Sequence, residues 1–150
     1  MTFPYVITTH SPEETERLGE GLAGALVSDS SLPRFIAMYG DLGVGKTAFV
    51  RGFTRAICPE AFVKSPTFAL VNEYRTKKTP IYHFDMYRIV DEDDLYSTGF
   101  YDYLEGEGYC IAEWCENIPY ALPEGYVRVE IRKTSYEVPD AREISITLEG

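Results

Sequence analysis

The feature that most constrains this chain is a glycine-rich turn between two apolar runs. The stretch MYGDLGVGKTAFVRGF, residues 38–53, contains the full pattern GxxxxGK[ST] at residues 40–47. Glycines let successive backbone N–H groups curl around one anion, and a helix that begins at the end of the turn adds its positive end. A turn of this kind between a buried strand and a helix predicts a phosphate-binding loop, or P-loop.

Residue types within the loop suggest how it would hold a nucleotide. Lys46 supplies a cation for the β and γ phosphates, and the Thr47 hydroxyl is one oxygen ligand for Mg²⁺. The loop residues that we expect to bind the nucleotide are Asp41, Leu42, Gly43, Val44, Gly45, Lys46 and Thr47. The chain lacks the NKxD segment that usually reads guanine, which favours adenine, and the start of the first helix near Ser11 is a candidate position for the base.

Apolar runs alternate with amphipathic segments, which predicts an α/β fold. Residues 34–39 and 109–114 are continuous apolar runs of the kind buried in parallel sheets, whereas residues 126–132 and 143–148 alternate apolar and polar positions. We expect the alternating pair to form an antiparallel hairpin near the sheet edge. Other short strands are expected at residues 3–8, 68–74 and 81–87.

Helices are expected where capping residues precede apolar periodicity. Ser11, Pro12 and Glu14 predict a capping box at the start of the first helix. Residues 47–57 predict a second helix, and the acidic residues 91–94 are expected to open a third, because acids favour the positive end of a helix. Together these elements predict a P-loop NTPase-like three-layer sandwich with a mixed, largely parallel central sheet and a C-terminal antiparallel hairpin, in one domain of residues 1–150.

Composition narrows the classes of partner. The net charge of −10 argues against tight direct binding to nucleic acid and is compatible with a basic protein partner. No apolar run approaches the ~20 residues that would span a membrane, and no signal peptide is visible. Cys58, Cys110 and Cys115 are odd in number and lack CxxC spacing, which predicts reduced thiols in a cytoplasmic protein.

Two predicted strands end in a carboxylate, which is where α/β sheets bind ligands. The strand IYHFD ends in Asp85, and the strand YCIAE ends in Glu113. Either acid could hold a metal ion or polarise water, and the residues alone do not say which. Thr67, in the segment KSPTF, could offer its hydroxyl to the γ phosphate or the metal, and His83 is expected to pack and hydrogen-bond inside the sheet.

Four segments in this order and at this spacing, GDLGVGKT, KSPTF, YHFDMYR and IAEW, resemble the bacterial TsaE family, also called YjeE, over about residues 10–118. The resemblance implies a cytosolic ATPase that uses ATP and Mg²⁺ and is required for N6-threonylcarbamoyladenosine in tRNAs that read ANN codons. It implies the TsaB–TsaD complex as partner, with little or no direct nucleic acid binding. Hydrolysis would reset that complex between turnovers, slowly without the partner and faster with it.

The resemblance also implies roles for single residues. Lys46 and Thr47 match the family's loop lysine and metal-binding threonine, Glu113 matches its magnesium glutamate, and Asp85 matches its Walker-B-like aspartate. The implied catalytic set is Lys46, Asp85, Glu113 and Thr67, and the implied metal ligands are Thr47 and Glu113.

Other positions match the family less directly. Thr67 lies in its switch-like segment and Trp114 is its characteristic tryptophan, while Ser11 and Arg142 are the best matches for further nucleotide contacts. Many members have proline after the EW pair, whereas this chain has Cys115.

Two other functions fit the same loop. A small-molecule kinase shares it but usually carries an arginine-rich lid, and the arginines of this chain are scattered. A nucleotide-dependent binding module would bind ATP, order the SPTF segment and dock a partner without needing hydrolysis. A phosphate acceptor would identify the kinase, and modification without hydrolysis would identify the binding module.

Overall fold

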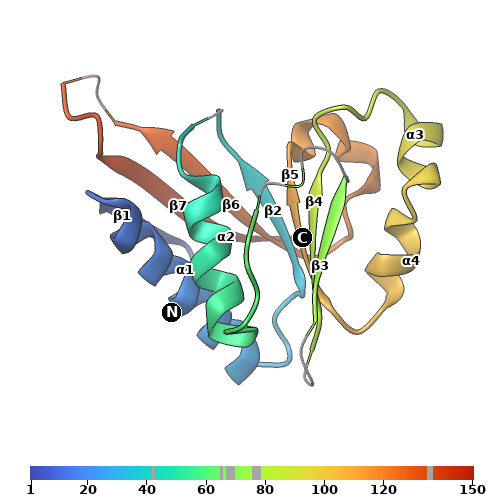
Figure 1. Ribbon diagram of the computed structural model, residues 1–150, viewed down its shortest axis with the longest axis horizontal. Helices are drawn as coiled ribbons and strands as arrows, with labels where there is room; N and C mark the ends of the chain where they lie inside the picture. Colours follow the sequence, from blue (N-terminus) through green and yellow to red (C-terminus); the bar gives the residue numbers. More distant parts are fainter. Residues whose placement is uncertain (42, 65, 67–69, 76–78, 135–136) are drawn as a thin grey trace.

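The computed structural model describes the whole chain except residues 42, 65, 67–69, 76–78 and 135–136 (Figure 1). Strands and helices alternate along the described residues. The strands are β1 (Tyr5–Thr9), β2 (Phe35–Tyr39), β3 (Val71–Tyr74), β4 (Ile81–Asp85), β5 (Tyr109–Glu113), β6 (Tyr126–Lys133) and β7 (Arg142–Glu149). The helices are α1 (Pro12–Ser28), α2 (Lys46–Ile57), α3 (Glu92–Ser97) and α4 (Phe100–Glu105), with 3₁₀ turns η1 (Cys115–Asn117) and η2 (Pro119–Ala121).

One mixed sheet runs through the molecule in the order β1-β7-β6-β2-β5-β4-β3. The pairs β6–β2, β2–β5 and β5–β4 are parallel, and the pairs β1–β7, β7–β6 and β3–β4 are antiparallel. The predicted mixed sheet with a C-terminal hairpin is confirmed, and it is partly rather than largely parallel, because three of its six strand pairs are antiparallel. The continuous apolar runs at β2 and β5 form its centre, where strands are buried on both faces.

The hairpin lies near the edge of the sheet, as predicted, but it does not form the edge itself. Strand β6 pairs with β2 as well as β7, and β7 lies between β6 and β1, so the hairpin is internal and β1 is the edge strand. Alternation of apolar and polar residues indicates that one face of a strand is exposed to solvent, but it does not indicate how many strands pair with that strand. The sequence alone could not place β1 beyond the hairpin.

Several strand boundaries also differ from the prediction. The strand expected at 81–87 ends at Asp85, because the Asp85 carboxylate accepts a hydrogen bond from the Tyr87 N–H at 2.9 Å and turns the chain. The first strand begins at Tyr5, after Pro4, which has no N–H to donate. The strand expected at 68–74 is Val71–Tyr74 in the described part of the chain, and residues 68–69 lie outside it.

The predicted helix starts are confirmed with one correction. The Ser11 hydroxyl accepts from the Glu14 N–H at 3.1 Å, but the Glu14 carboxylate accepts from the His10 N–H rather than the Ser11 N–H, so the box closes one residue early. Helix α3 begins after Asp91, whose carboxylate caps the Asp94 N–H at 2.9 Å. Both carboxylates sit at the positive end of a helix, where negative charge is favourable.

Helices cover both faces of the sheet and make three layers. Figure 1 shows α1 and α2 side by side on one face, with α3 and α4 on the opposite side beyond β3 and β4. The first face buries an apolar core that includes Leu22, Met38 and Phe53. The second face buries another that includes Phe84 and Phe100. The central strands therefore carry large apolar side chains on both faces.

Helices α1 and α2 approach closely through glycines. A Cβ atom added at Gly52 would lie 1.9 Å from the backbone oxygen of Glu16, and one added at Gly19 would lie 2.2 Å from the backbone oxygen of Phe49. Side chains at either position would push the two backbones apart. The P-loop sits at the start of α2, so this contact fixes the position of the loop relative to α1.

The three cysteines are buried and none forms a disulfide, which agrees with the prediction of reduced thiols. Burial raises the pKa of the Cys110 thiol to about 12 and also raises the pKa of the Cys115 thiol, so both are protonated at neutral pH. Among the residues that the structure describes, no helix is long and apolar enough to cross a membrane.

We expect Gly52→Ala to destabilise the fold by about 1–3 kcal/mol or more, because the methyl group must displace the α1 backbone. Gly24→Ala is the matched control, since a Cβ atom there meets nothing within 4 Å and alanine favours the helix. Urea unfolding of the two variants measures the difference. Equal stability of both variants would contradict the close approach.

Candidate functional site

The P-loop has the backbone shape that its glycines allow. Gly43 and Gly45 have φ values of 76° and 105°, in the left-handed region that favours glycine. Gly45 is also the N-cap of α2 and has no side chain to cap the helix, so the first N–H groups of α2 stay available to an anion. Lys46 and Thr47 are the first two residues of that helix. Leu42 lies outside the described residues.

Strand register brings the two predicted acids to this loop. In the parallel pairs β2–β5 and β5–β4, Met38 lies opposite Glu113, and Glu113 lies opposite Asp85. The carboxyl ends of the three strands therefore lie level with one another at one end of the sheet. Residues opposite each other in neighbouring strands share a face, so both carboxylates belong to the face that carries α2.

A cleft of about 510 Å³ forms at this edge. Its walls combine P-loop residues, both strand-end acids and the EW tryptophan, as the sequence predicts. The lining residues are Gly43, Gly45, Lys46, Thr47, Leu70, Asp85, Tyr87, Arg88, Glu113 and Trp114. A cleft with a cation, a hydroxyl and two carboxylates at one end has the donor set that a magnesium-bound polyphosphate requires.

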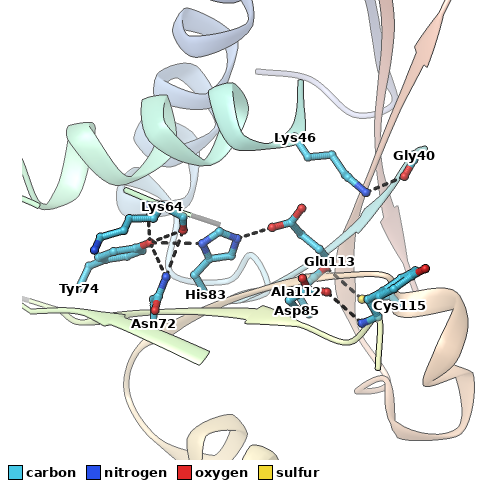
Figure 2. Close-up of polar contacts among 11 residues, drawn as sticks. Gly40, Lys46, Lys64, Asn72, Tyr74, His83, Asp85, Ala112, Glu113 and Cys115 are labelled. Carbon is cyan, nitrogen blue, oxygen red and sulfur yellow. Dashed lines mark hydrogen bonds and ion pairs between the residues drawn. The ribbon is translucent and has the colours of Figure 1, made fainter. Parts of the chain in front are cut away.

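Lys46 is held at the floor of the cleft. Its side-chain Nζ donates to the backbone oxygen of Gly40 at 2.6 Å (Figure 2). The same Nζ lies 4.6 Å from the centre of the Trp114 ring. The lysine is only 6% exposed, so the carbonyl and the ring compensate for the water that its charge has lost. A phosphate oxygen would be a stronger partner for the same charge.

Glu113 is buried and anchored by a histidine. Its Oε2 lies 2.6 Å from His83 Nε2, and His83 is fully buried (Figure 2). The expectation that His83 packs and hydrogen-bonds inside the sheet is confirmed, but its partner was not foreseen. The sequence did hold a signal for the position of His83. It lies two residues before Asp85 on one strand, so its side chain is on the same face of the sheet as the strand-end acid.

Trp114 and Cys115 form the turn that follows the Glu113 strand. Trp114 has a φ of 60°, a left-handed conformation that is strained for a tryptophan, and its ring packs 5.0 Å from that of Tyr87. Cys115 is the first residue of η1 and donates its thiol to the Ala112 oxygen at 3.1 Å. Proline also suits a first helical position, so a proline at position 115 would be compatible with the same turn.

Ser11 and Arg142 meet the P-loop from its other side. Both line a small cavity of about 170 Å³ with Gly43, Val44 and Gly45. The Ser11 hydroxyl is used to cap α1, and the Arg142 Nε donates to the Val44 oxygen at 2.9 Å. Arg142 thus braces the loop across 98 positions of sequence.

Some predicted residues are not brought into the cleft, and three residues that line the cleft were not predicted. Asp41 is exposed and lines a separate hollow over β6, and Thr67 lies outside the described residues. Leu70, Tyr87 and Arg88 line the cleft although none of them was predicted there. Within the described part of the chain, the Arg88 side chain has no hydrogen bond or ion pair.

Magnesium would have few protein ligands at this site. No group of three His, Cys, Asp or Glu side chains suited to a metal occurs in the described ranges. Mg²⁺ commonly takes one or two protein oxygens and completes its shell with phosphate and water. Thr47 and Glu113, which line one cleft, fit that mode of binding.

Known proteins resemble this chain over nearly its full length. The model of the family described as threonylcarbamoyl adenosine biosynthesis protein TsaE matches residues 9–144. This chain belongs to the TsaE family. The tRNA threonylcarbamoyladenosine biosynthesis protein TsaE of Bacillus subtilis is 34% identical over 95% of this chain and 84% of its own length. The protein of the same name from Haemophilus influenzae is 37% identical over 83% of this chain and 81% of its own length.

A solved structure gives the same result for the fold. The crystal structure of Bacillus subtilis YdiB superposes with a TM-score of 0.77 at 30% sequence identity and covers 100% of this chain and 88% of that one. The expected P-loop NTPase-like architecture and the TsaE resemblance are therefore both confirmed.

We expect Lys46→Ala to weaken ATP binding about 10- to 100-fold, because it removes a charge-assisted contact of about 1.5–3 kcal/mol. Trp114 is the only tryptophan and lies beside the Lys46 charge, so its fluorescence in a titration with Mg-ATP reports the affinity. Arg17→Ala, which removes an exposed cation on α1, should bind like the parent. Unchanged affinity in the Lys46 variant would contradict the P-loop assignment.

Proposed function

We propose that this TsaE family member binds and hydrolyses ATP for the N6-threonylcarbamoyladenosine modification of tRNAs that read ANN codons, in the cytoplasm, acting with the TsaB–TsaD complex. The observation that carries the proposal is the shared cleft, in which Lys46 and Thr47 of the P-loop face the strand-end carboxylates of Asp85 and Glu113. A binding loop alone would need no such acids.

The proposed role of each residue follows from its position in the cleft. Backbone N–H groups of Gly43 and Gly45 and the Lys46 charge would neutralise the phosphates of ATP. Thr47 and Glu113 would hold Mg²⁺, which when bound supplies positive charge against the phosphate oxygens. Asp85 would orient the attacking water or support the metal shell.

The remaining predicted contacts extend the nucleotide site. We propose that adenine lies towards the small cavity between the P-loop and α1, which Ser11 and Arg142 line. Thr67 is proposed to contact the γ phosphate or the metal from the KSPTF segment, and Leu42, Val44 and Asp41 to contribute loop backbone. The acidic charge of the chain supports a role in which the partner proteins make most of the tRNA contact.

Reconstitution tests the function directly. TsaB, TsaC, TsaD, tRNA, threonine, bicarbonate and ATP are combined with and without this protein, and modified tRNA is counted per TsaD. We expect more than one turnover only when this chain is present. A second assay compares its ATP hydrolysis with and without TsaB–TsaD, and equal rates would count against partner stimulation.

We expect Glu113→Gln to bind ATP but to lose hydrolysis and multiple-turnover modification, because the amide keeps the shape and loses the charge that would hold Mg²⁺. The matched control is Glu116→Gln, which alters an exposed acid three residues on. Full modification by the Glu113 variant with ATP bound would favour a nucleotide-dependent binding module instead. ATP-dependent phosphorylation of a metabolite in an acceptor screen would favour a small-molecule kinase.

A further inference from the structure

A buried chain of polar side chains leads away from the cleft behind Glu113. Glu113 is 6% exposed and His83 is fully buried, and most of the buried side chains on this face of the sheet are apolar. A hydrogen bond is strong in such a medium, and a broken one leaves a buried polar group without a partner. The 2.6 Å contact between His83 Nε2 and Glu113 Oε2 therefore holds both side chains in one orientation.

The other nitrogen of His83 is also engaged. Its Nδ1 lies 3.4 Å from the Tyr74 hydroxyl, which in turn lies 3.2 Å from the backbone oxygen of Lys64 (Figure 2). The Asn72 amide donates to the same Lys64 oxygen at 3.1 Å. Burial raises the pKa of Tyr74, so its hydroxyl stays protonated at neutral pH.

A single tautomer of His83 satisfies both contacts. With its proton on Nε2, the ring donates to the Glu113 carboxylate, and its Nδ1 faces the Tyr74 hydroxyl, whose single hydrogen is shared between this nitrogen and the Lys64 oxygen. The ring is then fixed at both ends, which a single hydrogen bond would not achieve. Histidines that orient a reactive group commonly have their second nitrogen held in this way.

The contact with His83 uses one oxygen of the Glu113 carboxylate and leaves the other for the cleft. Oε2 is taken by His83, whereas Oε1 has no hydrogen bond in the described part of the chain. Because Glu113 lines the cleft, Oε1 is the oxygen that a bound ligand can reach. Asp85 is held differently, by the N–H of Tyr87, so His83 acts on one acid only.

We propose that His83 is a positioning residue, which together with Tyr74 fixes the Glu113 carboxylate so that one oxygen faces the nucleotide cleft. The inference rests on the proposed function in so far as Glu113 acts on Mg-ATP. It adds a second requirement: Glu113 acts only while His83 holds its Oε2. His83 is in turn held by Tyr74 of β3.

Two substitutions at His83 distinguish the roles of its two ring nitrogens. In His83→Gln the amide nitrogen reaches the place of Nε2 and keeps the contact with Glu113, whereas in His83→Asn the amide lies near the place of Nδ1 and loses it. We expect His83→Asn to lower kcat for ATP hydrolysis about 10- to 100-fold, as loss of a partner behind a metal ligand does. ATP affinity measured by Trp114 fluorescence without Mg²⁺ should stay unchanged, and His83→Gln should recover most of the loss.

Controls distinguish positioning from general damage to the core. Tyr74→Phe should lower kcat less than His83→Asn, and Tyr82→Phe should leave it unchanged, since Tyr82 lies on the same strand pair but faces the opposite core. Thermal unfolding measures each variant's stability. Equal kcat in the Asn and Gln variants, or losses that follow stability alone, would overturn the proposal.

A spectroscopic test does not depend on hydrolysis. The chain has two histidines, so the exposed His10 is an internal reference for His83 in ¹H–¹⁵N spectra of the imidazole rings. We expect a slowly exchanging Nε2–H signal from His83 that shifts in Glu113→Gln, and a shift of Nδ1 in Tyr74→Phe. A His83 signal that shifts in neither variant would refute the positioning role. If the parent protein hydrolysed no ATP, the proposed function would fail, and these spectra would still decide the positioning of Glu113.

Discussion

The in-step parallel pairing of β2, β5 and β4 is the constraint on which the site depends. It sets Met38, Glu113 and Asp85 side by side at one edge, immediately before the chain turns into the P-loop, the Trp114 turn and the Asp85 turn. A slip of one residue in any of these pairs would point a carboxylate into the opposite apolar core. The apolar residues on both faces of the central strands oppose such a slip, so the packing of the core also fixes the geometry of the cleft.

Charge burial at this edge is tolerated because each charge has a partner. Lys46 is satisfied by the Gly40 carbonyl and the Trp114 ring, and Glu113 by His83. Removing charged groups from water is costly unless such partners exist. The same arrangement suits ligand exchange, since phosphate can replace a carbonyl beside Lys46 while the rear of Glu113 stays anchored.

Two different devices hold the P-loop itself. Glycines at 19 and 52 let α1 and α2 approach closely, which positions the start of α2, and Arg142 bonds the Val44 carbonyl from the last strand. The loop is therefore braced by elements from both ends of the chain. The position of the hairpin inside the sheet, with β1 outside it, is what brings Arg142 and the start of α1 to the same side of the loop.

The sequence by itself determined the loop, its lysine and threonine, the two strand-end acids and the type of each main element, because these depend on short-range backbone preferences and on local patterns of burial. It also carried the TsaE resemblance. Only the tertiary structure decided that β1 forms the edge, that His83 bonds Glu113, that Arg142 braces Val44 and that Arg88 lines the cleft. Those contacts join segments far apart in the chain, and they exist only once strand order and register have set which segments become neighbours.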